Sequence, residues 1–407
     1  MKEIQGGVTA AKGFEAASAA AEIKYKDRTD MAMIYSQVPC RAAGTFTTNV
    51  VKAAPVKWDQ NVVKNSEYVQ AVVVNSGIAN ACTGTEGYDY CKTTAEKAGE
   101  VLQIPAEAVL VGSTGVIGMQ LPIDRICAGI DKLAAAKSDT IAAGTDAAKA
   151  IMTTDTCKKE LAVTVEISGK TVTIGGMAKG SGMIHPNMCT MLSFVTTDAV
   201  ISKAALQKAL SEDVKDTYNM ISVDGDTSTN DTVLVLANGM AENEEIVEGT
   251  EDYARFAEAL HAVNVGLAKM IAGDGEGATA LLEVNVVGAE TKEQAVLLSK
   301  SVVCSNLTKT AIAGHDANWG RILCAMGYSG AQFDPEKVDL YLESAAGKLK
   351  IVENGRAASY SEEKATEILS QPVIIATANI KMGDAKATAW GCDLTHGYID
   401  INADYRS

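Results

Sequence analysis

The sequence lacks long apolar runs and clusters of basic residues. Its longest uninterrupted apolar stretches, such as residues 71–74 and 373–376, are far shorter than the roughly 20 residues that a transmembrane helix needs. Lys and Arg number 36 against 51 Asp and Glu, which gives a net charge of −15, and no basic run occurs that could neutralise phosphates. We therefore expect no membrane span, and neither nucleic acid nor an anionic membrane as a partner.

Patterned cysteines and histidines are also missing. The nine cysteines are an odd number, are spread widely and form no C-x-x-C pair, and the four histidines have no metal-ligand spacing. A disulfide framework and a zinc site are therefore not expected. Residues 1–12 hold no continuous apolar segment of the kind found in a signal peptide. We expect a cytoplasmic protein.

The composition present is that of an ordinary globular protein, with 407 residues, of which 47% are hydrophobic and 21% charged. At about 150 residues per domain, this length predicts two domains, and we place a boundary near residue 285, between 1–284 and 285–407. Strand-like and helix-like segments alternate, so the class is α with β. The expected strands are residues 33–35, 44–50, 70–75, 108–111, 171–174, 191–196, 232–237, 281–287, 338–343, 348–352, 373–380, 385–390 and 398–401. The expected helices are residues 93–102, 123–136, 253–270 and 291–304, with two more that begin after Ser202 and near Ser361.

The segment 178–192 could be a cleaved loop. Its glycines let the backbone bend, and Thr190 then opens a strand-like run. If the bond before Thr190 were cut, the new α-amine, with a pKa of about 7.7 to 8, could act as general base for the hydroxyl of the same residue. Spacing alone leaves two interpretations open: a nucleophile, or a β-branched residue in a core strand.

A second segment, residues 111–118, follows a strand-like run and places hydroxyl residues beside glycines. A backbone N–H and the side chain of Thr114 could face an oxyanion there. The segment lacks the G-x-G-x-x-G pattern of a dinucleotide-binding loop. A tight turn is the alternative interpretation.

Two other segments suggest a functional site at first, residues 224–231 and the pair His315 and Asp316, but we predict a structural role for each. Residues 224–231 suggest a calcium loop, but an EF-hand would need Gly and Glu where Thr229 and Val235 stand. We predict an Asp-rich turn. The neighbours His315 and Asp316 suggest a hydrolase triad, but the chain has no G-x-S-x-G elbow, so we predict that they lead into a helix.

From residue 179 to residue 192, the sequence resembles the ornithine acetyltransferase family of arginine biosynthesis, also called the glutamate N-acetyltransferase family. The resemblance extends along the whole chain, and its motifs are together very specific. The motifs that carry it are residues 6–10, 47–55, 75–80, 153–156, 222–231 and 402–406.

This resemblance implies a chain that cuts itself between Cys189 and Thr190, giving an α chain of residues 1–189 and a β chain of residues 190–407, which pair as an α2β2 heterotetramer. The implied fold is an αββα sandwich, similar to the aminopeptidase/D-esterase group, with a C-terminal α/β domain and a terminal tail that returns to the active site. The family usually has Ala where this chain has Cys189, which is also small and apolar. His185 is a second departure from the family pattern.

Residue roles follow from the same resemblance. Thr190 would be the nucleophile that accepts the acyl group, and Thr114 with Gly115 would form the oxyanion hole. A cation such as Lys179 suits a substrate carboxylate, and a carboxylate such as Glu276 suits a substrate amine. The implied substrate-binding residues are Thr153, with Thr154 as its alternative, Lys179, Thr190, Glu276, Asn402 and the terminal Ser407.

The implied reaction is a ping-pong transfer of the acetyl group from N-acetylornithine to glutamate through acetyl-Thr190, with no metal or bound cofactor. Whether acetyl-CoA is a second donor is left open. The rival interpretation is a self-cleaved aminopeptidase or amidase, in which water takes the acyl group from Thr190. A non-catalytic scaffold is disfavoured because the residues that the family motif demands are present.

Overall fold

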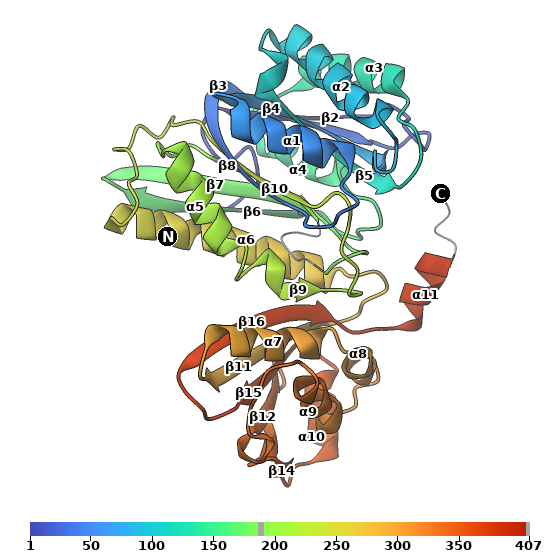
Figure 1. Ribbon diagram of the computed structural model, residues 1–407, viewed down its shortest axis with the longest axis vertical. Helices are drawn as coiled ribbons and strands as arrows, with labels where there is room; N and C mark the ends of the chain where they lie inside the picture. The colour runs from blue at the N-terminus through green and yellow to red at the C-terminus, as the bar shows by residue number, and fades with distance from the viewer. Residues whose placement is uncertain (186–190, 404–407) are drawn as a thin grey trace.

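The computed structural model describes residues 1–185 and 191–403. In these ranges the strands form a nine-stranded sheet and a seven-stranded sheet. Figure 1 shows the two sheets in separate parts of the molecule. None of the helices in these ranges is both long and apolar enough to span a bilayer.

The nine-stranded sheet is bent into two layers by one long strand, β3 (Met31–Phe46). The first part of β3 pairs with β2 (Phe14–Ala19) and β4 (Val69–Ile78), and its second part pairs with β10 (Thr232–Ala237). The pairing register with β4 shifts between Tyr35 and Cys40, around Pro39, which has no N–H to donate. Our prediction of two strands, 33–35 and 44–50, was wrong because the strand continues through this irregularity.

The two layers face each other across a shared apolar core. Phe194 of β8 (Leu192–Thr197) and Leu234 of β10 belong to the same core cluster as Val72 and Val74 of β4. Successive strand residues point to opposite faces, so Val195 and Val235 pack instead in the cluster that holds the helices α5 (Lys203–Asp213) and α6 (Glu251–Gly273).

The outer face of the other layer is covered by helices α2 (Glu86–Leu102) and α3 (Ile123–Ala136), whose apolar residues belong to the first cluster. The layers therefore run helix, sheet, sheet, helix, as Figure 1 shows from α2 and α3 down to α5 and α6. The predicted αββα sandwich is confirmed. The remaining elements of this part are β1 (Lys2–Ile4), α1 (Ala54–Asn65), β5 (Val109–Val116), α4 (Ile141–Ala150), β6 (Lys159–Ile167) and β7 (Lys170–Lys179).

The seven-stranded sheet has the order β14, β13, β12, β15, β11, β16, β9. Its strands are β9 (Ile221–Ser222), β11 (Leu281–Ala289), β12 (Asp339–Ser344), β13 (Gly347–Glu353), β14 (Arg356–Ala357), β15 (Val373–Asn379) and β16 (Ala385–Cys392). Its helices are α7 (Lys292–Val303), α8 (Asn306–Ala313), α9 (Trp319–Gly327) and α10 (Glu362–Leu369). The boundary near residue 285 falls within β11, and a division into two folding domains stays a prediction.

The C-terminal segment differs from our expectation. The alternating, β-branched residues at 398–401 predicted a strand, whereas the structure has the helix α11 (His396–Ala403). The hydroxyl of Thr395 accepts a hydrogen bond from the backbone N–H of Gly397, which starts the helical turn, and no neighbouring strand is available to pair with the segment in the described chain. The strand prediction was therefore wrong.

Candidate active site

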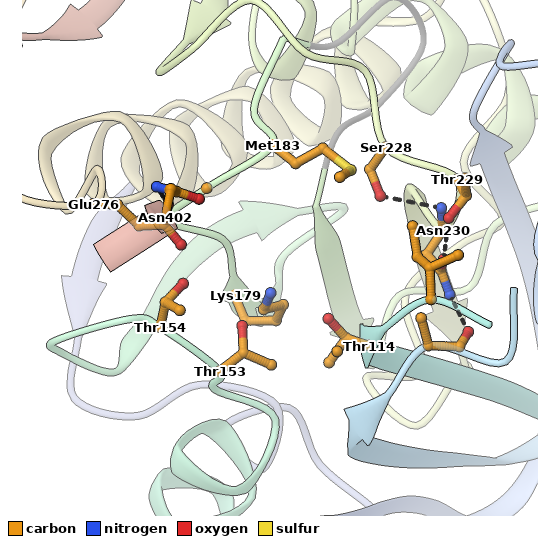
Figure 2. A pocket seen from close by; sticks show the side chains of 14 residues that line it. Thr114, Thr153, Thr154, Lys179, Met183, Ser228, Thr229, Asn230, Glu276 and Asn402 are labelled. Carbon is orange, nitrogen blue, oxygen red and sulfur yellow. Dashed lines mark hydrogen bonds between the residues drawn. The ribbon is translucent and has the colours of Figure 1, made fainter. Parts of the chain in front are cut away.

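A cavity of about 140 Å³ lies where several strand and helix ends meet. Six of the residues predicted from the sequence line this cavity, and Figure 2 shows five of their side chains around it. They are Thr114 and Gly115 of β5, Thr153 after α4, Lys179 at the end of β7, Glu276 after α6, and Asn402 of α11. Cys189, Thr190 and Ser407 lie outside the described residues. The fold thus brings six separate sequence positions together, and their individual roles stay predictions.

The end of β5 is a turn with a tightly constrained backbone. Gly115 has a φ of +130°, and a Cβ there would lie 2.2 Å from the carbonyl carbon of Gly77, so only glycine fits. The amide of Asn230 donates hydrogen bonds to the backbone carbonyls of Ala79 and Ser113, at 2.6 and 2.8 Å. The hydroxyl of Thr114 bonds to no other described residue and is free to donate into the cavity.

Lys179 supplies a buried positive charge. Among the described residues it forms no ion pair, although its side chain lines the cavity. Burial lowers its pKa, and the carboxylates of Asp155 and Glu276 oppose that shift without cancelling it. A buried ammonium without a carboxylate partner is suited to bind an anionic group of a ligand.

A buried ion network fixes the backbone on this side of the cavity. The Nζ atom of Lys159 lies 2.7 Å from Oδ1 of Asp155 and 2.6 Å from Oδ2 of Asp274, and its side chain is completely buried. Burial favours the neutral form of each group, but the carboxylates raise the pKa of Lys159. Burial likewise acts to raise the pKa of Asp155, and Lys179 and Lys159 outweigh it and lower that pKa to about 2.

The network reaches the cavity through backbone hydrogen bonds. Asp155 accepts from the N–H of Thr153 at 3.0 Å and from the N–H of Gly180 at 2.7 Å. Asp274 accepts from the N–H and the hydroxyl of Thr156. The sequence analysis included Asp155 only within the motif 153–156, and it predicted no role for Lys159. A lysine next to an acidic motif carries no signal that it is buried.

Glu276 and Asn402 line the cavity next to each other. The amide of Asn402 donates a hydrogen bond of 2.7 Å to Oε2 of Glu276. The N–H of Glu276 donates to the carbonyl of Ser181 at 3.0 Å, and the hydroxyl of Ser181 donates to the carbonyl of Asp274 at 2.7 Å. Asn402 is thus the point at which the C-terminal helix contacts the cavity.

The cavity has further lining residues to which the sequence analysis assigned no role. They are Ala79, Ile117, Gly182, Met183, Ser228, Thr229 and Asn230, together with Thr154, which was kept as an alternative to Thr153. Ala79 and Ile117 supply an apolar surface close to Thr114, where a methyl group could be buried. The residues 228–230 belong to the segment interpreted as an Asp-rich turn, so their hydroxyl and amide groups were assigned to the turn alone.

The arrangement combines a hydroxyl and a backbone turn, a cation, a carboxylate and a small apolar surface. Such groups can hold a zwitterionic amino acid derivative and stabilise a developing oxyanion. In the described chain, no group of three or more His, Cys, Asp or Glu side chains could hold a metal ion.

Comparisons with known proteins match this chain with a family. Residues 15–407 match the model of the ArgJ family. The chain is 53% identical over 407 residues to the arginine biosynthesis bifunctional protein ArgJ of Caldanaerobacter subterraneus subsp. tengcongensis, and 54% identical over 409 residues to that of Symbiobacterium thermophilum, each covering 100% of both chains. The crystal structure of the arginine biosynthesis bifunctional protein argJ from Bacillus halodurans is 47% identical with a TM-score of 0.51, and the match covers 53% of this chain and 99% of that one. The chain belongs to the ArgJ family.

Proposed function

We propose that this protein is an acetyltransferase of arginine biosynthesis that moves the acetyl group of N2-acetylornithine to glutamate through an acetyl ester on Thr190. One observation carries the proposal. The buried ammonium of Lys179 and the carboxylate of Glu276 line one small cavity together with the hydroxyl of Thr114, and within residues 1–185 and 191–403 neither the ammonium nor that hydroxyl has a side-chain partner. The names of the full-length relatives support the same pathway.

Each group has a task in this reaction. Lys179 binds the α-carboxylate of the amino acid, and Glu276 binds an amine. The hydroxyl of Thr190 attacks the acetyl carbonyl, and Thr114 and Gly115 donate to the oxygen that becomes negative. The α-amine of Thr190 takes the hydroxyl proton and passes it to the nitrogen of the leaving ornithine. Glutamate then attacks the acetyl ester by the reverse sequence, which restores the hydroxyl.

The size of the cavity supports an amino acid as the substrate. A cavity of about 150 Å³ holds a ligand of roughly six heavy atoms, and this one measures about 140 Å³. That is room for the reacting part of a single amino acid derivative, whereas a polypeptide substrate would need an extended groove.

The proposal includes self-cleavage before Thr190 into α and β chains that assemble as an α2β2 heterotetramer in the cytoplasm. The solved relative supports two separate chains, because a chain that is matched over 99% of its length covers only 53% of this one. Residues 190–407 make up about that share of the sequence. Denaturing electrophoresis should give two fragments, and N-terminal sequencing of the β chain should begin at Thr190.

The decisive experiment separates a transferase from an amidase. Purified enzyme incubated with N-acetylornithine and no glutamate should release one equivalent of ornithine in a burst and add one acetyl mass to the β chain. Glutamate should discharge that ester, and double-reciprocal plots for the two substrates should be parallel. Ornithine release that is equally fast without glutamate would establish water as the acceptor. A parallel assay with acetyl-CoA tests whether the enzyme is bifunctional.

A further inference from the structure

One carboxyl group joins three segments of the chain beside the cavity. Asp224 lies just after β9 and is partly buried. Its Oδ2 atom accepts hydrogen bonds from the N–H of Met183 at 2.6 Å and from the hydroxyl of Tyr398 at 3.2 Å. Its Oδ1 atom accepts from the N–H of Ile184 at 2.9 Å and from that of Asp226 at 3.1 Å. The carboxyl group does not line the cavity, and the proposed reaction gives it no task.

The backbone bonds to Asp224 hold an uncommon conformation. Met183 has a φ of +56°, which a residue with a side chain adopts only where its surroundings impose it. Gly182 before it lies so close to Glu276 that an added Cβ would be 2.3 Å from Oε2 of that carboxylate. Figure 2 shows Met183 and Glu276 both lining the cavity. The two backbone bonds to Asp224 therefore keep this stretch of chain beside Glu276.

A second route leads from Asp224 to the same carboxylate through α11. Tyr398 and Asn402 are four residues apart and therefore lie on one face of this helix. The amide of Asn402 donates to the carbonyl of Tyr398 at 3.0 Å and to Oε2 of Glu276 at 2.7 Å. The start of the helix packs on Gly277, where an added Cβ would lie 2.5 Å from the backbone nitrogen of Tyr398. The bond from Tyr398 to Asp224 therefore ties down the same helix face that carries Asn402.

We propose that Asp224 is a positioning residue for Glu276, which it holds in the orientation that binds the substrate amine. The inference deepens the proposed function and rests on its assignment of that amine to Glu276. Asp224 itself does not touch the substrate. It acts by way of the backbone at Met183 and by way of Tyr398, and both routes end at Oε2 of Glu276.

This position requires a carboxylate, because all four of its partners donate. A carboxylate has two acceptor oxygens, whereas an asparagine amide has one acceptor oxygen and an NH2 group that donates. Each oxygen of Asp224 accepts from at least one backbone N–H, so an asparagine would point an N–H at a backbone N–H in either orientation. Burial and the negative charge of Asp224 raise the pKa of Tyr398, so its hydroxyl stays protonated and remains a donor.

The first test measures the steady-state kinetics of the purified enzyme with N-acetylornithine. Asp224→Asn disturbs both routes, so KM should rise about tenfold while kcat stays within about twofold. Tyr398→Phe keeps the ring and interrupts only the route through α11, so KM should rise about threefold. Asp226→Asn is the matched control, because it removes the same charge from the same turn, yet the side chain of Asp226 forms no hydrogen bond or ion pair in the described chain. It should leave both constants unchanged.

A double variant shows whether Tyr398 acts through Asp224. In an Asp224→Ala background the tyrosine hydroxyl has already lost its acceptor, so adding Tyr398→Phe should change KM by less than about twofold. Hydrogen–deuterium exchange tests the same positioning without any substrate. Asp224→Asn and Tyr398→Phe should each speed the exchange of backbone N–H groups in residues 396–403 about threefold or more, and Asp226→Asn should not.

Three results would overturn the proposal: additive effects of Asp224→Ala and Tyr398→Phe on KM, exchange in residues 396–403 at the wild-type rate, or a fall in kcat as large as the rise in KM. If Asp224→Asn does not fold, Tyr398→Phe decides by the same kinetic and exchange measurements. Failure of acetyl transfer in the wild type would overturn the proposed function and leave the exchange measurement intact, so the two failures are distinguishable.

Discussion

Two walls of the same cavity are built in different ways. The strand wall consists of Thr114, Thr153 and Lys179, and its residues Thr153 and Lys179 lie against the fully buried Lys159 and its two carboxylate partners. The helix wall consists of Asn402, which belongs to α11, a helix with no buried residues.

Among the described residues, further contacts of α11 are a 3.2 Å hydrogen bond from the hydroxyl of Tyr398 to Asp224 and the close packing of Gly397 on Gly277. Just before the helix, the hydroxyl of Thr395 donates to the carbonyl of Gly277.

The difference suggests that the two walls of the cavity have different roles, one in catalysis and one in substrate binding. Buried, charge-assisted hydrogen bonds give one wall a single geometry before substrate arrives, which is what stabilising a transition state requires. A helix attached by a few partly buried hydrogen bonds can separate at a smaller cost than a buried ion network and let an amino acid enter or leave. Stability and turnover should therefore depend on the first wall, and substrate affinity on the second.

The largest effect is expected from Lys159→Met. Removing the ammonium leaves the buried carboxylates of Asp155 and Asp274 without their direct ion-pair partner, which costs about 3–5 kcal/mol of the free energy of unfolding. Urea denaturation of the variant and of the wild type measures this loss in the free energy of unfolding. Lys149→Met is the matched control, since Lys149 is exposed and pairs with Asp146 at the surface, and it should change stability little. Equal stability of the two variants would show that the network does not support this wall.

The next effect is on turnover at the strand wall. Thr114→Ala in cleaved enzyme removes a donor that is used when negative charge develops, so kcat should fall about 10²-fold while KM changes little. Steady-state kinetics with N-acetylornithine and glutamate test this. Thr154→Ala is the control on the same cavity, and we expect its kcat to stay within a few fold. An unchanged kcat in Thr114→Ala would place the oxyanion hole elsewhere.

The strand wall should also show a characteristic pH dependence. The folded-state pKa of Asp155 is about 2, below its ordinary value, because Lys179 and Lys159 outweigh the effect of burial. A depressed carboxyl pKa adds stability above the unfolded pKa near 3.9, and this stability, on the order of 2 kcal/mol, is lost as the pH falls towards 2. Unfolding measured between pH 5 and pH 2 should be less pH-dependent in Asp155→Asn, and identical slopes would contradict this origin.

The sequence predicted some parts of this comparison and missed others for physical reasons. Strand and helix patterning predicted the class of α with β, and the resemblance to a known family implied the αββα sandwich and the roles of Thr114, Lys179 and Glu276, because both patterning and motifs are local signals. The buried Lys159 could not, since its partner Asp274 lies 115 residues away and only the fold joins them. The strand expected at 398–401 failed because local alternation cannot show that no strand is available to pair with it.

The smallest effect is expected from the helix wall. Asn402→Ala removes the 2.7 Å hydrogen bond to Glu276, and because the residue is exposed, stability should change by less than about 0.5 kcal/mol. The loss leaves Glu276 free to turn away from a substrate amine, so KM for N-acetylornithine should rise about three- to tenfold while kcat changes little. Asn306→Ala, at the start of the distant helix α8, is the control and should alter neither constant. If Asn402→Ala lowers kcat as strongly as Thr114→Ala, the helix wall takes part in the chemical step, and the division between a fixed catalytic wall and an adjustable binding wall does not hold.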